Sequence, residues 1–343
     1  MTDAPWLSVV GGFLGAGKTT LILAAASELA RRGLKSAIIL NDQGDSLVDT
    51  QFARHKGLDA AEVTGGCFCC RFSDLVDSAT TLRAHAPDVI FAEPVGSCTD
   101  ISATVLRPLC ETYSGQFRLT PFTVCVDPAR ARQIESEGSN PHVAFLFRNQ
   151  LDEADLVCYT KSDLYPDAIP SPNARYVSAL TGQGVAAWLD ELLGGQLAAG
   201  SRTLAIDYGE YARAEAALAW MNLSATIECR PLISPALLLG PLLDHIAAGV
   251  EVVHLKATDQ CDSGFLKAAM CSNREEPHIE GALDASPAHH HEILINLRAT
   301  GDPVHVRGVV EESMADLAGK ILYQHIACFT PAPPTRPSLC ARL

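Results

Sequence analysis

The sequence predicts an α/β protein, with a doubly wound, mostly parallel sheet in its first part and a second, smaller α+β domain after it. Short β-branched runs alternate with helical stretches up to about residue 193, and a glycine-rich loop joins the first run to the first helix. Alternation of this kind places a parallel sheet between two layers of helices. After residue 193, small and flexible residues (GGQLAAGS) end the alternation and indicate a domain boundary.

The first domain is expected to cover residues 1–198. Its strands are expected at residues 7–10, 36–40, 89–92, 122–126, 156–159 and 175–177. Its helices are expected at residues 19–32, 72–85, 101–112, 143–152 and 185–192. The strand segments are short and rich in β-branched and apolar residues, which is typical of strands that are buried on both faces of a parallel sheet.

The second domain is expected to cover residues 199–330, with a proline-rich tail at residues 331–343. Its strands are expected at residues 204–207, 225–229, 250–257 and 293–297, and its helices at residues 211–221 and 235–248. The tail carries four prolines between residues 331 and 337, so no regular structure is expected there. The sequence therefore predicts a small sheet domain with a mobile end.

Composition excludes several classes of function. The net charge of −14 opposes binding to nucleic acid or to an anionic membrane. No apolar stretch approaches the roughly 20 residues that span a bilayer, and the N-terminal residues lack the pattern of a signal peptide. Twelve cysteines in such a chain are expected to be reduced thiols. A cytoplasmic protein with no nucleic-acid or membrane partner is expected.

The segment GFLGAGKT, residues 12–19, lies between an apolar strand and an apolar helix, which is the context of a phosphate-binding P-loop. Backbone N–H groups of such a loop turn inward around phosphates, and the helix dipole favours the anion. Lys18 is expected to reach the β and γ phosphates, and the Thr19 hydroxyl is expected to bind Mg²⁺. The residues expected to hold the nucleotide here are Gly12, Gly15, Ala16, Gly17, Lys18, Thr19 and Thr20.

Three further segments are expected to complete the nucleotide site. Glu93 follows the third expected strand and is assigned to Mg²⁺ or its water, which makes it catalytic together with Lys18 and Thr19, and Gly96 offers an amide to the γ-phosphate. Residues 160–163 (TKSD) resemble the guanine-reading NKxD element with Thr in place of Asn, and residues 178–180 (SAL) resemble the loop that supports guanine O6. The residues expected to read guanine are Lys161, Asp163, Ser178 and Ala179.

Three cysteines fall within four residues in GGCFCC, residues 65–70. Converging thiolates suit soft ions such as Zn²⁺ or Cu(I), so Cys67, Cys69 and Cys70 are expected to bind a metal ion. A set of buried thiols in a turn is the alternative. Most other cysteines are expected in the core, whereas Cys98 follows EPVG and could approach the thiols or the nucleotide.

With the P-loop, GGCFCC, EPVG and TKSD in this order, residues up to about 200 resemble the CobW-like P-loop GTPase metallochaperones, relatives of the urease and hydrogenase nickel-insertion GTPases. The resemblance implies a GTP hydrolase with a slow intrinsic rate that uses GTP and Mg²⁺ and carries Zn²⁺, Co²⁺ or Ni²⁺. It also implies that Asp42 and Asp45, in the segment NDQGD, belong to a switch that helps to bind Mg²⁺ or the transferred metal.

The predicted function is that of a GTP-dependent metal chaperone or insertase, which binds a transition metal at GGCFCC and delivers it to a recipient metalloprotein or cofactor enzyme on GTP hydrolysis. Acceleration is expected from a partner or from a second protomer in a nucleotide-dependent homodimer. Two alternatives remain: a GTPase loading factor for a cofactor-dependent enzyme, such as a corrinoid enzyme, and a P-loop kinase or ATPase with a structural thiol loop. The three histidines at residues 289–291 are expected in a solvated loop.

Overall fold

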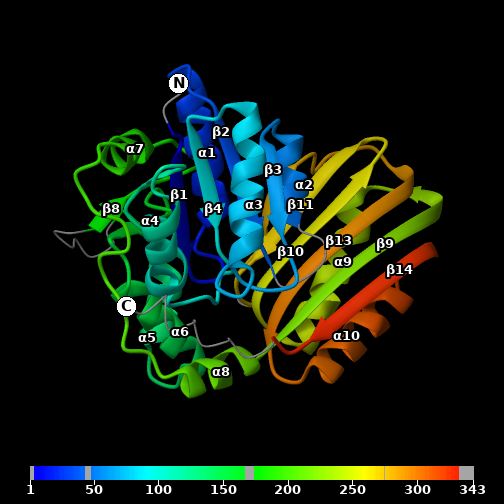
Figure 1. Cartoon of the computed structure of the whole chain (residues 1–343). Coiled ribbons are helices and arrows are strands. Elements are labelled where there is room, and N and C mark those ends of the chain that lie inside the picture. The colour runs from blue at the N-terminus through cyan, green and yellow to red at the C-terminus, as the bar shows by residue number, and fades with distance from the viewer. Residues whose placement is uncertain (1–3, 43–47, 167–173, 274, 332–343) are drawn as a thin grey trace. The chain divides into compact units, whose positions relative to one another are not determined.

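The chain folds into two compact units, which Figure 1 shows as a ribbon. The computed structural model describes residues 4–42, 48–166, 174–273 and 275–331. Of the described residues, the first unit contains 4–42 and 49–214, and the second contains Val48 and residues from Glu215 onward. The contacts thus divide the chain after Ala214, beyond the position near residue 198 at which the composition changes, because the tyrosines of a further helix bond to the first unit.

The first unit is built on a parallel sheet, as predicted. Its strands are β1 (Trp6–Gly12), β2 (Ser36–Asn41), β3 (Asp59–Val63), β4 (Val89–Glu93), β5 (Arg118–Leu119), β6 (Thr123–Val126), β7 (Leu156–Tyr159) and β8 (Ala174–Tyr176). They lie in the order β3-β2-β4-β1-β6-β7-β8, with β5 paired to β1. Because β1 lies in the middle, with β4 on one side and β6 on the other, its carboxyl end is the switch point at which open α/β sheets bind ligands.

Helices follow most of these strands. They are α1 (Lys18–Arg31), α2 (Val48–His55), α3 (Phe72–Leu82), α4 (Arg107–Tyr113), α5 (Pro128–Glu135), α6 (Pro141–Asp152), α7 (Val185–Leu193) and α8 (Tyr208–Ala216). A 3₁₀ turn (Arg83–His85) extends α3, and a π-helical turn (Ser102–Leu106) precedes α4. All six strands and five helices predicted for this unit are present, and β3, β5, α2 and α5 are additional.

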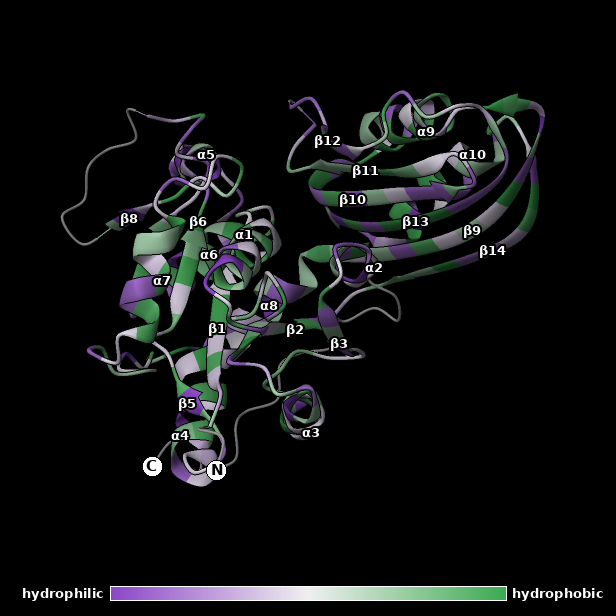
Figure 2. Cartoon of the chain, turned by 90° about the horizontal axis from the view of Figure 1, so that it is seen from above, coloured by the Kyte–Doolittle hydropathy of each residue, from purple (hydrophilic) through white to green (hydrophobic). Residues whose placement is uncertain are grey.

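The second unit is an antiparallel sheet with two helices, which confirms the predicted α+β class. Its elements are β9 (Leu218–Ile233), α9 (Pro235–Gly249), β10 (Glu251–Cys261), β11 (Gly264–Met270), β12 (His278–Gly281), β13 (Ala288–Thr300), α10 (Pro303–Ala315) and β14 (Lys320–Phe329). The strand order is β12-β11-β10-β13-β9-β14. Along each long strand hydrophobic and hydrophilic residues alternate (Figure 2), as expected when one face of a sheet carries the core.

The core of the second unit lies between the sheet and its two helices. Alternate residues of β9 from Ala219 to Cys229 belong to it, and so do residues of α10 at four-residue spacing, Val306, Val310 and Met314. Period two on the strand and a three-to-four-residue period on the helix direct these side chains to one layer. None of the helices in the described ranges is long and apolar enough to cross a membrane.

Two predictions for the expected second domain, residues 199–330, are wrong. Residues 204–207 form no strand, and the helix expected at residues 211–221 ends at Ala216, because β9 begins at Leu218. Residues 218–223 are all buried, so their apolar run carries no periodicity that separates a buried strand from a helix. The strands β11, β12 and β14 and the helix α10 were not predicted.

Candidate nucleotide and metal site

The P-loop leaves β1 at its carboxyl end and leads directly into α1, as the sequence predicts. Gly12 has a φ of 131°, and a Cβ atom there would lie 2.3 Å from the carbonyl oxygen of Cys125 on β6. Only glycine adopts this backbone without strain and without that collision. The tight turn at Gly12 therefore directs the following residues, including Gly15, Ala16 and Gly17, across the end of the sheet.

Lys18 and Thr19 begin α1, and both side chains are buried. The Lys18 Nζ donates to the carbonyl oxygens of Gly12 (2.8 Å) and Phe13 (3.3 Å) and lies 4.0 Å from Glu93 Oε1. Thr20, the next residue of the helix, is exposed. The loop thus holds one buried ammonium group beside its own backbone.

Thr19 and Glu93 lie together, as the two residues assigned to Mg²⁺ must. The Thr19 hydroxyl donates to both carboxylate oxygens of Glu93, at 3.1 and 2.9 Å. Glu93 ends β4, which pairs in parallel with β1, so this contact follows from adjacent strands that end at the same edge. A hydroxyl, a carboxylate and phosphate oxygens are the ligands that Mg²⁺ takes in P-loop proteins, so the side chains present fit the ion.

The segment after β7 also approaches the P-loop. The Thr160 hydroxyl donates to the carbonyl oxygen of Ala16 at 2.8 Å, so this residue joins the segment after β7 to the P-loop. Lys161 adopts a φ of 55° and pairs with the carboxylate of Asp127, while Asp163 is half-buried. The backbone N–H of Ser178 donates to Gln183 at 2.9 Å, and Ala179 follows it in the same turn.

The thiol loop follows β3 and is attached to the sheet by one side chain. Asn41, at the end of β2, donates its amide to the carbonyl oxygens of Val63 (2.9 Å) and Gly66 (2.7 Å), and it accepts the N–H of Phe68 at 2.8 Å. These three bonds use both amino hydrogens of the side chain and one of the two acceptor positions of its carbonyl oxygen. Asn41 therefore holds the loop over the end of β2, a role that its position in NDQGD did not predict.

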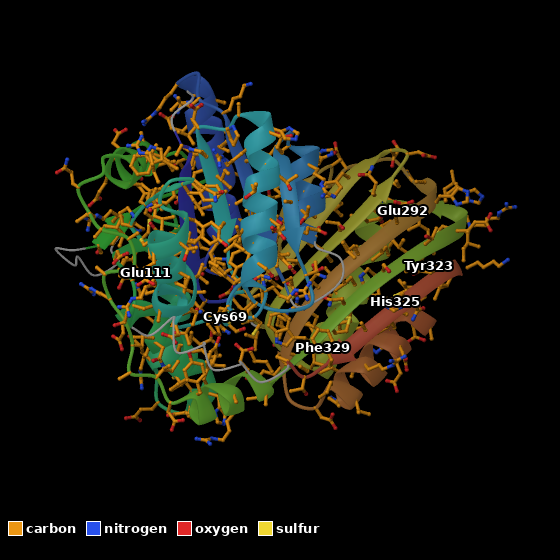
Figure 3. All side chains as sticks on the ribbon, viewed as in Figure 1. Cys69, Glu111, Glu292, Tyr323, His325 and Phe329 are labelled. Atoms are coloured by element: carbon orange, nitrogen blue, oxygen red, sulfur yellow. The ribbon has the colours of Figure 1, made fainter. Side chains whose placement is uncertain are left out.

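The three thiols converge. Sulfur atoms of Cys67 and Cys70 lie 3.5 Å apart and those of Cys69 and Cys70 3.8 Å apart, and all three lie within 4.8 Å of one another. Cys67 is buried, Cys69 is half-buried and Cys70 is exposed; Cys69 is labelled in Figure 3. The cluster has both the ligand type and the closeness that a soft metal ion requires.

The thiols are electrostatically unequal. Hydrogen bonds from Cys69, Cys70 and Cys98 to the sulfur of Cys67 lower the pKa of Cys67 well below its usual value. Hydrogen bonds with Cys67, Cys70 and Cys98, together with burial, raise the pKa of Cys69 well above its usual value. A thiolate is the form of cysteine that binds metals and reacts, so Cys67 is the thiol of this cluster that ionises most readily. Cys98 had been left open by the sequence, and the structure brings it to these thiols.

The two aspartates of the switch segment are placed differently. Asp42 continues β2, where its backbone N–H donates to Val63 at 3.1 Å. Asp45 lies outside the described residues. The expectation that these carboxylates help to bind a metal stays a prediction.

The histidines at residues 289–291 lie in β13, so the prediction of a solvated loop is wrong. The reason is pairing of this segment with β9 and β10. His291 is buried and bonds to Asp259 at 2.8 Å. The pairing of β13 with β9 has a bulge between Ala288 and His290. Close to it lies a second cluster of possible metal ligands in the described ranges, in which one ligand atom each of Glu228, His289 and His290 lies within 4.8 Å of the others.

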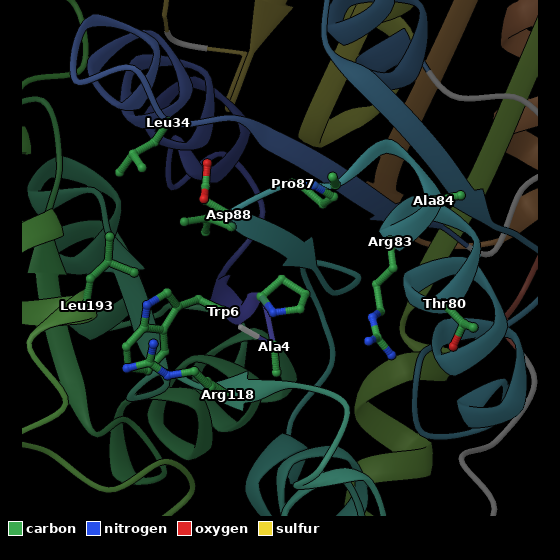
Figure 4. A pocket seen from close by; sticks show the side chains of 13 residues that line it. Ala4, Trp6, Leu34, Thr80, Arg83, Ala84, Pro87, Asp88, Arg118 and Leu193 are labelled. Carbon is green, nitrogen blue, oxygen red and sulfur yellow. The ribbon is translucent and has the colours of Figure 1, made fainter. Parts of the chain in front are cut away.

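A pocket of about 720 Å³ lies at the amino ends of the central strands of the first sheet. Its lining includes Trp6 and Val89, the first residues of β1 and β4, and the guanidinium of Arg118 stacks on Trp6 at 3.8 Å from the ring centre (Figure 4). Because the P-loop and Glu93 follow the carboxyl ends of the same strands, this pocket is separate from the nucleotide site.

Comparisons with known proteins agree with this geometry. A family model described as the nucleotide-binding domain of CobW/HypB/UreG proteins matches residues 6–182. The zinc chaperone YeiR of Escherichia coli (strain K12) is 31% identical over 160 residues, which are 46% of each chain. The zinc chaperone CobW of Sinorhizobium sp is 30% identical over 181 residues, and the zinc chaperone YjiA of Escherichia coli (strain K12) is 27% identical over 171 residues. These matches cover 46% and 47% of this chain and 51% of each relative, so the chain spans about half the length of the curated relatives it matches.

Proposed function

This chain belongs to the CobW/HypB/UreG family through residues 6–182, and from this premise we propose that it is a GTP hydrolase that binds a transition-metal ion and delivers it to a recipient protein. The observation that carries the proposal is that the nucleotide-binding residues and the thiol loop lie at the same edge of the parallel sheet. Leu40 of β2 lies opposite Glu93 of β4, so Asn41, which holds the thiol loop, follows directly beside the carboxylate assigned to Mg²⁺. Nucleotide and metal sites are thus built on neighbouring strand ends.

The nucleotide is bound by the P-loop and the segments beside it. Backbone amides from Gly12 to Thr20 surround the phosphates, Lys18 neutralises the β and γ phosphates, and Thr19 with Glu93 holds Mg²⁺. When bound, Mg²⁺ supplies positive charge at the γ-phosphate. Gly96 contributes an amide on the same side. We assign no arginine of this chain to the γ-phosphate. Hydrolysis is therefore slow until a partner or a second protomer completes the site.

The base is guanine. The Asp163 carboxylate accepts from guanine N1–H and the amino group, the Lys161 stem covers the base, and the Ser178–Ala179 turn supports O6. Support comes from Thr160, whose hydroxyl bond to Ala16 joins this segment to the P-loop, and from the ion pair that fixes Lys161 against Asp127.

The transferred ion binds to Cys67, Cys69 and Cys70, and Asp42 and Asp45 are further candidates from the switch segment. We assign Zn²⁺ as the first candidate, because three relatives carry the name of zinc chaperone and thiolates suit this ion; Co²⁺ and Ni²⁺ are the others. The eleven cysteines in the described ranges are all free thiols, which suits a reducing compartment such as the cytoplasm.

The GTP form orders the switch residues and Glu93–Gly96, assembles the thiolate site and engages the recipient, and hydrolysis releases the ion. The recipient is a metalloprotein or an enzyme whose cofactor requires the ion.

Two variants test this proposal directly. The triple variant Cys67→Ser, Cys69→Ser, Cys70→Ser should lose the high-affinity metal site in a competition titration against a chromogenic chelator, while GTP binding persists. The variant Lys18→Ala should lose GTP hydrolysis, because the positive charge at the phosphates is removed. Its metal binding, measured without nucleotide, should persist. Full metal affinity in the triple variant would contradict the proposal.

A further inference from the structure

Two histidines and a glutamate meet on neighbouring strands of the second unit. Glu228 lies in β9, and His289 and His290 lie in β13. One ligand atom from each of the three lies within 4.8 Å of the others; Glu228 and His289 are half-buried and His290 is exposed. We propose that these three side chains, the β9–β13 cluster, form a second metal site, with nitrogen and oxygen ligands, and that Zn²⁺ fits it best. This site does not rest on the proposed function, because the thiols belong to the first unit.

An irregular stretch in the pairing of β9 with β13 brings two adjacent histidines to one carboxylate. His290 lies directly opposite Glu228, whereas Ala288 lies opposite Ile233. Residues 229–232 of β9 therefore lie between these two pairs, where β13 has only His289. Adjacent residues of a regular strand point to opposite faces of the sheet, but a bulged pair removes this constraint. The rings of His289 and His290 consequently lie side by side, with 4.8 Å between their centres.

The ring of His289 is oriented as that of a metal ligand. Its Nδ1 lies 2.7 Å from the carbonyl oxygen of Cys229. A carbonyl oxygen only accepts, so Nδ1 carries a proton and donates it. In the neutral ring the lone pair is then on Nε2, which lies 3.3 Å from Oε1 of Glu228. Metal-bound histidines almost always donate their other N–H to a carbonyl or a carboxylate in this way.

The spacing and the type of these ligands fit Zn²⁺. Two ligands that each lie about 2.0–2.1 Å from a tetrahedral Zn²⁺ lie about 3.3 Å from one another, which is the separation of the His289 and Glu228 atoms. Two histidines and one glutamate form a known zinc ligand set, in which the fourth position stays open to water or to another ligand. Imidazole ligands do not suit Mg²⁺ or Ca²⁺.

Arg230 is the cation that the metal ion displaces. Its Nη2 lies 3.1 Å from Oε1 of Glu228, and its side chain is 76% exposed. Exposed ion pairs contribute little to stability, so Glu228 exchanges this partner for a divalent ion at small cost. The β9–β13 cluster offers one negative charge, against up to three at the thiols. Zn²⁺ is therefore held more weakly in β13 than by the thiols, and it exchanges more readily.

The test removes the thiol site first and then takes the second site apart. The starting protein is the full chain with Cys67→Ser, Cys69→Ser and Cys70→Ser, and Zn²⁺ binding is measured by calorimetry without nucleotide. Three proteins are compared with it: Glu228→Gln, the pair His289→Ala and His290→Ala, and a control pair. The control removes His278 of β12 and His325 of β14 (labelled in Figure 3), two exposed strand histidines outside the cluster, by His278→Ala and His325→Ala.

The starting protein and the control should bind one equivalent of Zn²⁺ with the same affinity. Glu228→Gln should bind at least about tenfold more weakly, because loss of an outer-shell partner alone costs tenfold to a hundredfold, and the histidine pair should lose the site. Equal binding in all four proteins, or no binding in the starting protein, would overturn the inference. The proposed function is judged separately, because it fails only if the parent and the starting protein bind Zn²⁺ alike.

A second measurement uses the parent protein, whose fold no substitution disturbs. Long-range ¹H–¹⁵N NMR of the imidazole rings should show the His289 proton on Nδ1. The second equivalent of Zn²⁺ should then shift Nε2 of His289 and the ring of His290, and leave His278 and His325 unchanged. A proton on Nε2 of His289 alone, or rings that do not respond to Zn²⁺, would contradict the assignment.

Discussion

Asn41 shows how a single side chain fixes the metal loop. Its three bonds to Val63, Gly66 and Phe68 join the end of β2 to the loop that carries the thiols. Such bonds orient ligands without touching the metal, and their loss typically costs tenfold to a hundredfold in metal affinity. The residue thus matters for the site although it is not a ligand.

We expect Asn41→Ala to lower Zn²⁺ affinity by about 10- to 100-fold, measured by competition with a chromogenic chelator. The matched control is Asn149→Ala, which should leave the affinity unchanged, because among the described residues the Asn149 amide bonds within its own helix, to Phe145. Equal affinities in the two variants would show that the loop holds its shape without Asn41.

Glu153 gives a second test at this scale. It is fully buried, and burial raises the pKa of its carboxyl from 4.5 to about 8. The folded protein therefore holds a proton that the unfolded chain releases, so the stabilisation is complete below pH 4.5 and is lost as the pH rises towards 8. Across this interval the free energy of unfolding should fall with a slope of up to about 1.4 kcal/mol per pH unit.

We expect Glu153→Gln to flatten this dependence, because an amide can keep bonds to Thr99 and Ser102 without a titrating proton. Urea unfolding at pH 5, 6, 7 and 8 measures it, with Glu111→Gln, a change at an exposed position labelled in Figure 3, as the control. If Glu153→Gln keeps the pH dependence of the parent, another group is responsible.

Residues of the site differ in how far the sequence could predict them. Lys18 and Thr19 belong to a local motif, and Glu93 follows a recognisable buried strand, so their positions were predicted; their roles in binding Mg²⁺ and phosphate stay predictions. Asn41 acts through contacts with a loop that is distant in the chain. A single sequence carries no signal for such contacts, and the pairing of β2 with β3 and the bonds of the Asn41 side chain reveal them.

At the scale of elements, the beginning of α5 joins a helix cap to Lys161, the residue that we propose covers the base. Asp127 caps this helix by accepting the N–H groups of Ala129 (2.9 Å) and Arg130 (3.4 Å), and it also pairs with Lys161. The neighbouring helix α6 has an equivalent cap, in which Asn140 accepts from His142 (2.9 Å) and Val143 (3.4 Å). The two caps differ mainly in the ion pair.

We expect Asp127→Ala and Asn140→Ala each to lower the free energy of unfolding by about 1 kcal/mol, the usual cost of a lost cap, measured by urea denaturation. Only Asp127→Ala should also weaken GTP binding, measured with a fluorescent GTP analogue, because it releases Lys161. Equal GTP affinity in both variants would show that the ion pair between Asp127 and Lys161 does not contribute to base binding.

Helix α5 itself was not predicted, although Asp127 and Pro128 form a recognisable start; its content of charged residues hid the short helix. The sequence predicts β13 only at residues 293–297, because three adjacent polar histidines before them are typical of a loop. Strand β3 (DAAEV) is polar for a parallel strand and lacks the apolar run by which its neighbours were found.

At the scale of the whole molecule, the two units differ in how far the sequence predicts them. The first was predictable because strand, loop and helix alternate with motifs at the strand ends, and its class and family are confirmed. The second lies beyond the residues that the family model matches, and its order of strands depends on long antiparallel pairings that no short motif announces. The nucleotide and thiol sites both belong to the first unit, so their coupling is the central claim about the molecule.

The measurement that tests this claim most directly is a Zn²⁺ competition titration of the reduced, Mg²⁺-loaded protein with either GDP or a non-hydrolysable GTP analogue. The account predicts one stoichiometric thiol site whose affinity differs at least about tenfold between the two nucleotides, a coupling free energy of about 1.4 kcal/mol. The same affinity in both nucleotide states would contradict it, since the thiols would then bind metal without regard to the nucleotide.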